Sequence, residues 1–313
     1  MKLSVVLCTY NPRTEYLFRV LEALKGQTLS PSGWEFVLVD NNSTNSFRDS
    51  IDLSWHPNAK VVEEKQPGLT PARITGIRTA GAEIIVCVDD DNVLRRDYLE
   101  NSLSFLEKHP EVGAVGGKSI PLYEKAPPAW FSELNISLGC RDLGNQVQIT
   151  SQKGKPVRIY PPMAPIGTGM VIRRKAFLDY ADEAQQDPVR KALGRTGKAL
   201  TSGEDNDMVL TLLRNGWEVA YSPDLYIDHL IPAGRVDSFY LAKMNRASSK
   251  SWLQVLAVHG IFPWKPVAPW TVPIRKIRAF FRIKPWKSPL QQIKYQGACG
   301  IFEGRAAIRQ RWM

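Results

Sequence analysis

Three apolar runs restrict the fold of this chain most strongly, because each has the length of a strand that is buried on both faces. They occupy residues 5–7, 36–39 and 84–88 and consist mainly of β-branched and aliphatic side chains. Unbroken runs of this kind are typical of parallel sheets, whose two faces are both covered by helices. The runs therefore predict an α/β unit rather than a sandwich of alternating strands.

Helical patterns separate these runs. Apolar residues recur at helical spacing after the first run, at Leu17, Val20, Leu21 and Leu24. Thr70 followed by Pro71 predicts the N-cap and first residue of a second helix, and a third is expected over residues 96–108. Strands and helices that alternate over about 110 residues predict right-handed βαβ units that bind ligands at the carboxyl ends of the strands.

The regular alternation of apolar runs and helical patterns ends after about residue 112. Residues 113–172 are rich in Gly and Pro, which predicts loops and short mixed strands. A further helix is expected from about Asp205 to Asn215, with Gly216 ending it. The four cysteines are far apart and form no C-x-x-C pair, which disfavours a zinc site or a disulfide framework and favours a reducing, cytoplasmic compartment. No apolar run reaches the ~18 residues of a membrane span.

The positive charge of the chain lies in its C-terminal part. The formal net charge is +10, yet residues 235–313 contain fifteen Lys and Arg against two acids, and the rest of the chain holds 26 basic and 29 acidic residues. Trp and Phe alternate with these cations, which suits an anionic membrane surface or single-stranded nucleic acid. A solvated helix that packs its aromatics on the protein is the plain alternative. No nucleic-acid-binding motif accompanies the charge, so nucleic acid is disfavoured.

Three consecutive carboxylates follow the third apolar run, at Asp89, Asp90 and Asp91. They would repel one another unless a cation or a hydrogen-bond donor lies among them, and a hard divalent ion is the natural occupant. Mg²⁺ or Mn²⁺ held in this way can bridge a diphosphate. The alternative is a solvated acidic turn before the next helix.

Two further sites carry chemistry. Glu204 and Asp205 precede the expected helix, where a carboxylate can act as a general base or serve only as a cap. His229 follows Asp228 and is either a metal ligand or a structural histidine. The chain has no G-x-G-x-x-G after its first apolar run and no phosphate-binding P-loop, which disfavours dinucleotide oxidoreductases and P-loop enzymes.

Five motifs in order resemble the GT-A-fold family 2 glycosyltransferases. They are residues 5–11, residues 39–43, the segment from Gly68 to Ile77, the Asp89–Asp91 cluster and residues 202–205. The likeness covers residues 3 to 230. It implies an α/β GT-A fold with a Rossmann-like, mostly parallel twisted sheet and helices on both faces, to which the sequence adds a basic helical C-terminal extension.

The resemblance also implies an activity and a site. The activity is inverting transfer of a sugar from a nucleotide-diphosphate donor, with UDP favoured, to a hydroxyl of a glycan or lipid-linked acceptor in cell-surface polysaccharide synthesis. The donor would bind at Thr9, Tyr10, Asn11, Asp40, Gly68, Arg73, Asp89 and Asp90. A divalent metal, Mn²⁺ or Mg²⁺, would bind at Asp89, Asp91 and His229, and Asp205 would be the base, with Glu204 holding it or the acceptor.

The expected domains follow from this division of labour. Residues 1–234 form the catalytic domain, with a nucleotide-binding half at 1–112 and an acceptor half at 113–234, and residues 235–313 form the extension. We expect the extension to dock on the inner face of a membrane. Two alternatives stay open: a metal-dependent nucleotidyltransferase, which usually needs a basic glycine-rich loop after its first strand, and a non-catalytic protein that binds polyanions or carbohydrate on a GT-A scaffold.

Overall fold

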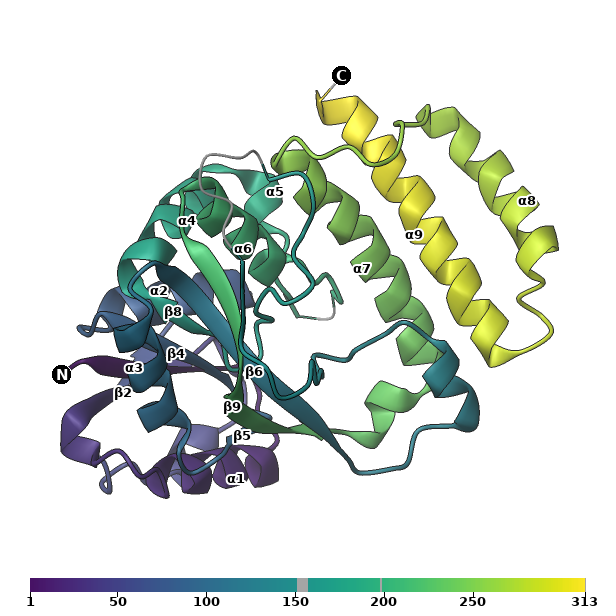
Figure 1. Ribbon diagram of the computed structural model, residues 1–313. Coiled ribbons are helices and arrows are strands. Elements are labelled where there is room, and N and C mark those ends of the chain that lie inside the picture. The colour runs from purple at the N-terminus through teal and green to yellow at the C-terminus, as the bar shows by residue number, and fades with distance from the viewer. Residues whose placement is uncertain (151–156, 198, 313) are drawn as a thin grey trace. The chain divides into compact units, whose positions relative to one another are not determined.

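A computed structural model describes residues 1–150, 157–197 and 199–312 (Figure 1). In these residues nine strands form one sheet, in the order β3-β2-β1-β4-β8-β6-β9-β5, with β7 pairing to β9. The chain divides into two compact units. The first comprises residues 1–122, 139–186 and 208–230, and the second comprises residues 123–138, 187–207 and 231–313.

The first unit begins with a parallel sheet. Its strands are β1 (Leu3–Thr9), β2 (Trp34–Asp40), β3 (Ala59–Glu63) and β4 (Ile84–Asp89). Each of the three apolar runs forms a strand, and β1 lies between β2 and β4 in parallel register with both. The predicted α/β class is therefore confirmed, and the parallel strands are the ones that carry the predicted ligand edge.

Antiparallel strands complete the sheet. They are β5 (Asn92–Leu94), β6 (Val112–Tyr123), β7 (Gln148–Thr150), β8 (Val171–Arg173) and β9 (Glu218–Ile231). The prediction of irregular structure from residue 113 is wrong for β6, which is a twelve-residue strand. Its glycines permit close approach of a neighbour: a Cβ at Gly117 would lie 1.7 Å from the carbonyl oxygen of Leu225. Residues 151–156, which also belong to the predicted loop region, lie outside the described residues.

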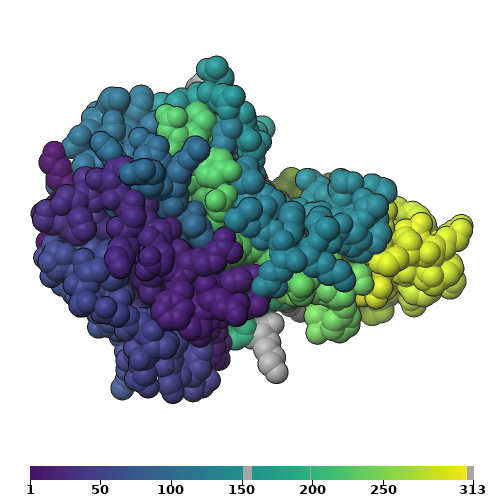
Figure 2. Space-filling view, turned by 90° about the horizontal axis from the view of Figure 1, so that it is seen from below, coloured from purple at the N-terminus to yellow at the C-terminus, as the bar shows by residue number. Residues whose placement is uncertain are grey.

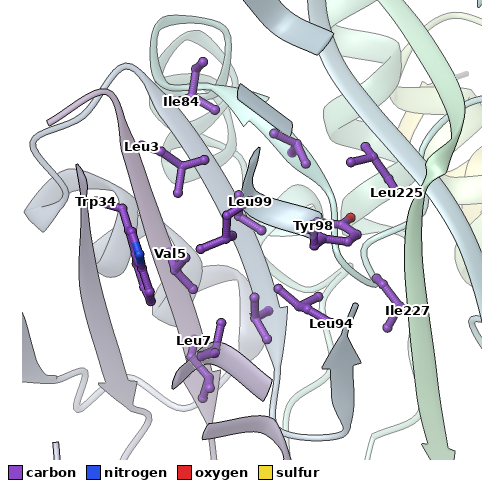
Figure 3. Packing of buried hydrophobic residues seen from close by; sticks show 14 of the residues in the cluster. Leu3, Val5, Leu7, Trp34, Ile84, Leu94, Tyr98, Leu99, Leu225 and Ile227 are labelled. Atoms are coloured by element: carbon purple, nitrogen blue, oxygen red, sulfur yellow. The ribbon is translucent and has the colours of Figure 1, made fainter. Parts of the chain in front are cut away.

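Five helices contribute to the first unit or begin at its boundary. They are α1 (Thr14–Lys25), α2 (Leu69–Thr79), α3 (Tyr98–Lys108), α4 (Arg174–Gln186) and α6 (Glu204–Arg214). Alternate side chains of β1 join different cores. Val5 and Leu7 pack with residues of α1 and α3, and Figure 3 shows them on the same side of the sheet as Leu99 of α3. Val6 and Cys8 pack with residues of α2, α4 and α6 on the opposite face, so helices cover both faces as predicted.

The start of α2 differs from the prediction. The helix begins at Leu69, and its N-cap is Gly68, with φ 135°, rather than Thr70. No side chain caps the start of α2. The amide of Gly68 donates a hydrogen bond to the side-chain oxygen of Asn41. The other predicted helices are confirmed with small shifts: α3 begins two residues later than expected, and α6 ends before Gly216, whose φ is 86°.

The second unit is helical. Its helices are α5 (Pro188–Lys191), α7 (Ser238–Val258), α8 (Val272–Ile283) and α9 (Pro289–Trp312), together with the first turn of α6. Within this unit α9 lies between α7 and α8 (Figure 1). Small residues let α9 approach α7 closely: a Cβ at Gly300 would lie 2.2 Å from the carbonyl oxygen of Arg246.

The second compact unit is not one continuous segment of the chain. The second unit takes residues 123–138 and 187–207 from the middle of the chain in addition to the segment from residue 231 onward.

In the part of the chain that the structure describes, no helix is both long and apolar enough to cross a bilayer. Figure 2 shows the N-terminal residues of the first unit, purple to blue, packed into one continuous body.

Candidate donor-binding and catalytic site

The carboxyl ends of three parallel strands bring the predicted donor-side residues to one edge of the sheet. The register places Thr9 opposite Asp40 across β1 and β2, and Cys8 opposite Asp89 across β1 and β4. The loops that follow β2 and β4 therefore both start beside the loop that follows β1, although they are about 30 and about 80 residues away from it in the chain. Ligands of open α/β sheets bind at this edge.

The three aspartates of the cluster each have a different partner. Asp89 pairs with Arg73, whose Nη2 lies 3.2 Å from Asp89 Oδ1. Asp90 accepts a hydrogen bond from the hydroxyl of Thr9. Asp91 accepts one from the side-chain amide of Asn92 at 2.9 Å. The repulsion that the sequence predicted is thus relieved in part by donors of the protein itself, without excluding a bound cation.

Arg73 is the buried cation of this edge. Only 3% of its surface is exposed, and its Nη2 also donates to the carbonyl oxygen of Gly167 at 3.3 Å. The helix α2 presents it, and the glycine cap at Gly68 allows the chain to turn into that helix. A buried guanidinium beside a carboxylate suits recognition of a diphosphate.

The loop after β1 is held by Asn11. This residue has φ 47°, and its side-chain oxygen accepts hydrogen bonds from the amides of Thr44 and Asn45 at 2.8 and 3.2 Å. Asn11 therefore ties this loop to the loop after β2. Tyr10, its neighbour, is 47% exposed, so its ring is accessible for stacking on a nucleobase.

Asp40 is engaged within the protein. Its Oδ1 accepts from the amide of Ser43 at 2.9 Å, and its Oδ2 accepts from Nε of Arg48 at 2.5 Å. The carboxylate is buried, whereas the Arg48 side chain is 41% exposed. A nucleoside that contacts Asp40 would therefore share this carboxylate with Arg48.

Asn41 is a positioning residue that the sequence reasoning did not single out. It is buried, its amide donates to the carbonyl oxygens of Glu64 and Gln66 at 3.0 and 2.7 Å, and its oxygen accepts from Gly68 at 2.7 Å. Asn41 thus fixes the segment that leads into α2. Its place beside Asp40 in the second motif was the only signal in the sequence.

His229 meets Asp91 because β5 pairs with β9. The register sets Asn92 opposite His229, and His229 Nε2 lies 3.4 Å from Asp91 Oδ1. Nδ1 of the same ring lies 3.6 Å from Sγ of Cys140. Burial lowers the pKa of His229, but the charge and hydrogen bond of Asp91 outweigh it and raise that pKa to about 10. Two of the three predicted metal ligands are therefore adjacent.

The third predicted ligand, Asp89, pairs with Arg73, and among the described residues no three His, Cys, Asp or Glu side chains converge to hold a metal. Magnesium-type ions at nucleotide sites usually take one or two protein carboxylates and complete their shell with water and substrate phosphates. The Asp91 carboxylate fits that donor set, whereas the His229 imidazole could join it only in its neutral form, after it loses the proton that Asp91 stabilises.

The predicted base, Asp205, lies in the first turn of α6, which belongs to the second unit. Glu204 is buried, whereas Asp205 is partly exposed and is the second residue of the helix rather than its N-cap. Carboxylates in a first turn are favoured by the helix dipole. Gly203 lets the chain pass close to α7, because a Cβ there would lie 2.9 Å from Cγ2 of Val255.

A buried charge cluster supports this turn, and the sequence reasoning missed it. Asp207 is fully buried, and its Oδ2 accepts from Nε of Arg190 at 2.8 Å while its Oδ1 lies 2.7 Å from Nε2 of His259. The cluster joins α6 to α5 and to the residue that ends α7.

Solved structures share this fold. The chain aligns with residues 1–349 of TarS from Staphylococcus aureus at 14% identity and a TM-score of 0.52, covering 99% of this chain and 92% of that one. It aligns with the mannosyltransferase PcManGT from Pyrobaculum calidifontis, solved with GDP-Man and Mn²⁺, at 20% identity and a TM-score of 0.53, covering 94% and 73%. At these identities the likeness shows the fold alone.

Curated relatives match part of the chain. A glucosyl-dolichyl phosphate glucuronosyltransferase of Haloferax volcanii is 28% identical over 152 residues, which are 46% of this chain and 47% of that protein. The amylovoran biosynthesis glycosyltransferase AmsE of Erwinia amylovora is 30% identical over 125 residues, 39% of this chain and 46% of that protein. The chain thus spans less than half the length of these relatives.

A family model matches the N-terminal part of the chain. The model of glycosyl transferase family 2 matches residues 4–180, which include the parallel sheet, the aspartate cluster and Arg73. Glu204, Asp205 and His229 lie beyond that match. Because the matched segment is more than half of the sequence, the chain belongs to glycosyl transferase family 2.

Proposed function

We propose that this glycosyltransferase moves a sugar from a nucleotide-diphosphate donor, with UDP the favoured nucleotide, to a hydroxyl of a glycan or lipid-linked acceptor in cell-surface polysaccharide synthesis. The observation that carries the proposal is the edge of the first unit, where Thr9, Asp40 and the Asp89–Asp91 cluster lie at the ends of neighbouring parallel strands. Structural neighbours of this fold bind such donors: TarS was solved with UDP and with UDP-GlcNAc, and PcManGT with GDP-Man.

The donor-side residues divide the nucleotide sugar between them. The exposed ring of Tyr10 would stack on the nucleobase, and hydrogen bonds of Asp40 and Asn11 hold the surrounding loops. Arg73 lies beside Asp89, where it can pair with a phosphate. The glycine at residue 68 lets the backbone come close to the donor.

Asp91 and His229 would hold Mn²⁺ or Mg²⁺, with Asp89 as the further candidate ligand that now pairs with Arg73. When bound, such an ion neutralises negative charge on a diphosphate leaving group. The protein side chains around the aspartate cluster have a separate role. They would orient the donor, and through their hydrogen bonds and the Arg73 ion pair they hold Asp89, Asp90 and Asp91 in place.

Asp205 is the proposed base. Its carboxylate would accept the proton of the acceptor hydroxyl while that oxygen bonds to the anomeric carbon and the bond from this carbon to the diphosphate breaks. One displacement of this kind inverts the anomeric configuration. Glu204 is buried one residue before it and would hold the base or the acceptor.

The regions of the chain follow the same division. Residues 1–234 would form the catalytic region, with the nucleotide-binding half at 1–112 and the acceptor half at 113–234. Residues 235–313 would dock on an anionic membrane face, which would bring the enzyme to a lipid-linked acceptor. Family membership and the absence of a basic glycine-rich loop after β1 favour this function over nucleotidyl transfer.

Isothermal titration tests the donor half of the proposal. We expect one of UDP, GDP and dTDP to bind to the full chain in the presence of Mn²⁺ and to bind more weakly without it. Asp91→Asn removes the charge that a metal needs, so we expect affinity in Mn²⁺ to fall by about 10- to 100-fold, as for other changes around metal sites.

Asp224→Asn is the matched control, because Asp224 is exposed on β9, the strand that also carries His229. It should bind the nucleotide as the wild type does. Absence of nucleotide binding with and without Mn²⁺ would contradict the proposed function, and equal loss in both variants would assign the effect to charge in general.

A further inference from the structure

The helix α8 exposes a row of large apolar side chains. Ile274, Ile277 and Phe281 are 47%, 58% and 65% exposed. Their spacing of three and four residues places them on one face of the helix. Trp270, which is 75% exposed, stands four residues before Ile274 and extends the row beyond the helix start.

A row of arginines runs directly beside this apolar row. Arg275, Arg278 and Arg282 each follow one of the three apolar residues by a single position, so they lie on the adjoining strip of the helix. No Asp or Glu occurs between residues 238 and 302. The exposed side of α8 therefore combines apolar side chains with positive charge that no nearby acid in the sequence offsets.

The opposite side of α8 is already in use. Ala279 is buried, and the ring of Phe280 lies 5.6 Å from that of Tyr295 on α9. The ammonium of Lys276 lies 2.6 Å from the Glu303 carboxylate on the same helix. Because α9 holds the inner side of α8, the apolar row is not what anchors the helix to its unit.

The dimensions and ends of α8 suit a bilayer surface. Twelve residues form a helix of about 18 Å, which is too short to cross a membrane, so α8 could meet a bilayer only along its surface. Trp270 and Trp286, the latter 56% exposed, flank the helix. Tryptophan is favoured at the depth of the lipid headgroups.

We propose that α8 lies flat on an anionic phospholipid bilayer, with Ile274, Ile277 and Phe281 at the acyl boundary and the arginine row on the lipid phosphates. This deepens the membrane role proposed for residues 235–313 by naming the surface that binds. A second copy of the chain would bring two strongly basic surfaces together, which is electrostatically unfavourable. Two of the three side chains in the row on α8, Ile274 and Ile277, do not offer the stacking planes that single-stranded nucleic acid uses.

Co-sedimentation of the full chain with vesicles tests the proposal without any need for catalysis. We expect binding to vesicles of phosphatidylcholine with about 30% phosphatidylglycerol and much weaker binding to phosphatidylcholine alone. Arg278→Gln with Arg282→Gln should lower the partition coefficient about 25-fold, because each arginine near such a surface contributes a factor of about five. Arg19→Gln with Lys108→Gln, which removes two exposed charges of the first unit, should change it little.

Phe281→Ser tests the apolar contribution against a closely matched control. Phe239 on α7 is 63% exposed, nearly the same as Phe281 at 65%. We expect Phe281→Ser to lower vesicle binding about tenfold or more and Phe239→Ser to leave it unchanged. Circular dichroism and thermal melting should show that all four variants remain folded, since the substituted side chains are exposed.

Three results would overturn the proposal. The first is no preference for anionic vesicles. The second is equal loss of binding in the Phe281 and Phe239 variants. The third is a protein that does not bind vesicles and instead either binds a single-stranded oligonucleotide tightly or forms a dimer that Phe281→Ser abolishes. Because nucleotide titration is independent of these assays, failure here leaves the proposed transferase function standing, and the reverse also holds.

Discussion

The first turn of α6 carries two aspartates in opposite environments. Asp205, the proposed base, is partly exposed, whereas Asp207 is fully buried and held by Arg190 and His259. A buried carboxylate loses its hydration, so its charge persists only with partners of this kind. Asp207 therefore acts by fixing the turn that presents its neighbour.

Removal of this buried charge should be costly. Asp207→Asn removes the buried negative charge that faces Arg190 and His259, so we expect the free energy of unfolding to fall by about 3–5 kcal/mol. Asp207→Leu combined with Arg190→Met removes both charges and should cost less than the sum of the single changes. Urea unfolding of the single and double variants measures this coupling.

An exposed ion pair of the same length is the control. Arg78 and Asp182 are also 2.8 Å apart, but their side chains are 43% and 67% exposed. We expect Asp182→Asn to change the free energy of unfolding by no more than about 1 kcal/mol, because solvent screens the pair. Similar effects at both pairs would show that burial does not decide the strength of the Asp207 cluster.

Single residues also show where sequence reasoning stops. Thr9, Arg73 and the aspartate cluster could be predicted to share one edge, because strand ends and motifs are visible in the sequence. The roles of Asn41 and Asp207 could not, because their partners lie 17 to 52 residues away or are backbone atoms. Only the folded chain brings such partners together.

The helix α2 packs closely against the sheet at Gly76. A Cβ on this glycine would lie 2.4 Å from Cγ1 of Val6 and 2.7 Å from Cγ2 of Val39. Alanine favours helices over glycine by about 1 kcal/mol, but overpacking a core costs about 1–3 kcal/mol. We expect Gly76→Ala to lower the free energy of unfolding by about 1–2 kcal/mol in urea titrations.

Gly33→Ala is the comparison for Gly76. A Cβ at Gly33 would meet only the side chain of Leu29, at 3.7 Å, an ordinary contact. We expect a change within about 0.5 kcal/mol. A Gly76→Ala protein as stable as the wild type would mean that α2 can shift away from β1 and β2 at little cost.

Elements differed in how far the sequence revealed them. The buried runs predicted β1, β2 and β4, because a continuous apolar stretch is a local signal. The strand β6 was missed, because its glycines resemble loop residues until Leu225, 108 positions later, is packed against Gly117. The pairing of β5 with β9, which brings His229 to Asp91, is equally non-local.

At the scale of the whole molecule, the second unit draws on three separate segments of the chain. The helix α7 and residues 202–207 belong to the same unit and are joined by specific bonds. Ser251 donates to the carbonyl oxygen of Ser202 at 2.8 Å, and His259 contacts Asp207. The segment that carries the proposed base is therefore supported by the C-terminal extension, although the two are separate in the sequence.

Truncation at residue 234 should expose this dependence. The shortened chain loses α7, and with it the contacts of Ser251 and His259, so residues 187–207 should become open to trypsin at Arg190 and Arg195. The first unit keeps its own two cores, so nucleotide binding should persist. Limited proteolysis and titration measure protection and nucleotide binding separately, and the full chain with Phe281→Ser should both resist trypsin at these sites and bind nucleotide. If truncation left the 187–207 segment as protected as in the full chain, the extension would not support the base, and membrane docking could then be tested by deletion as well as by substitution.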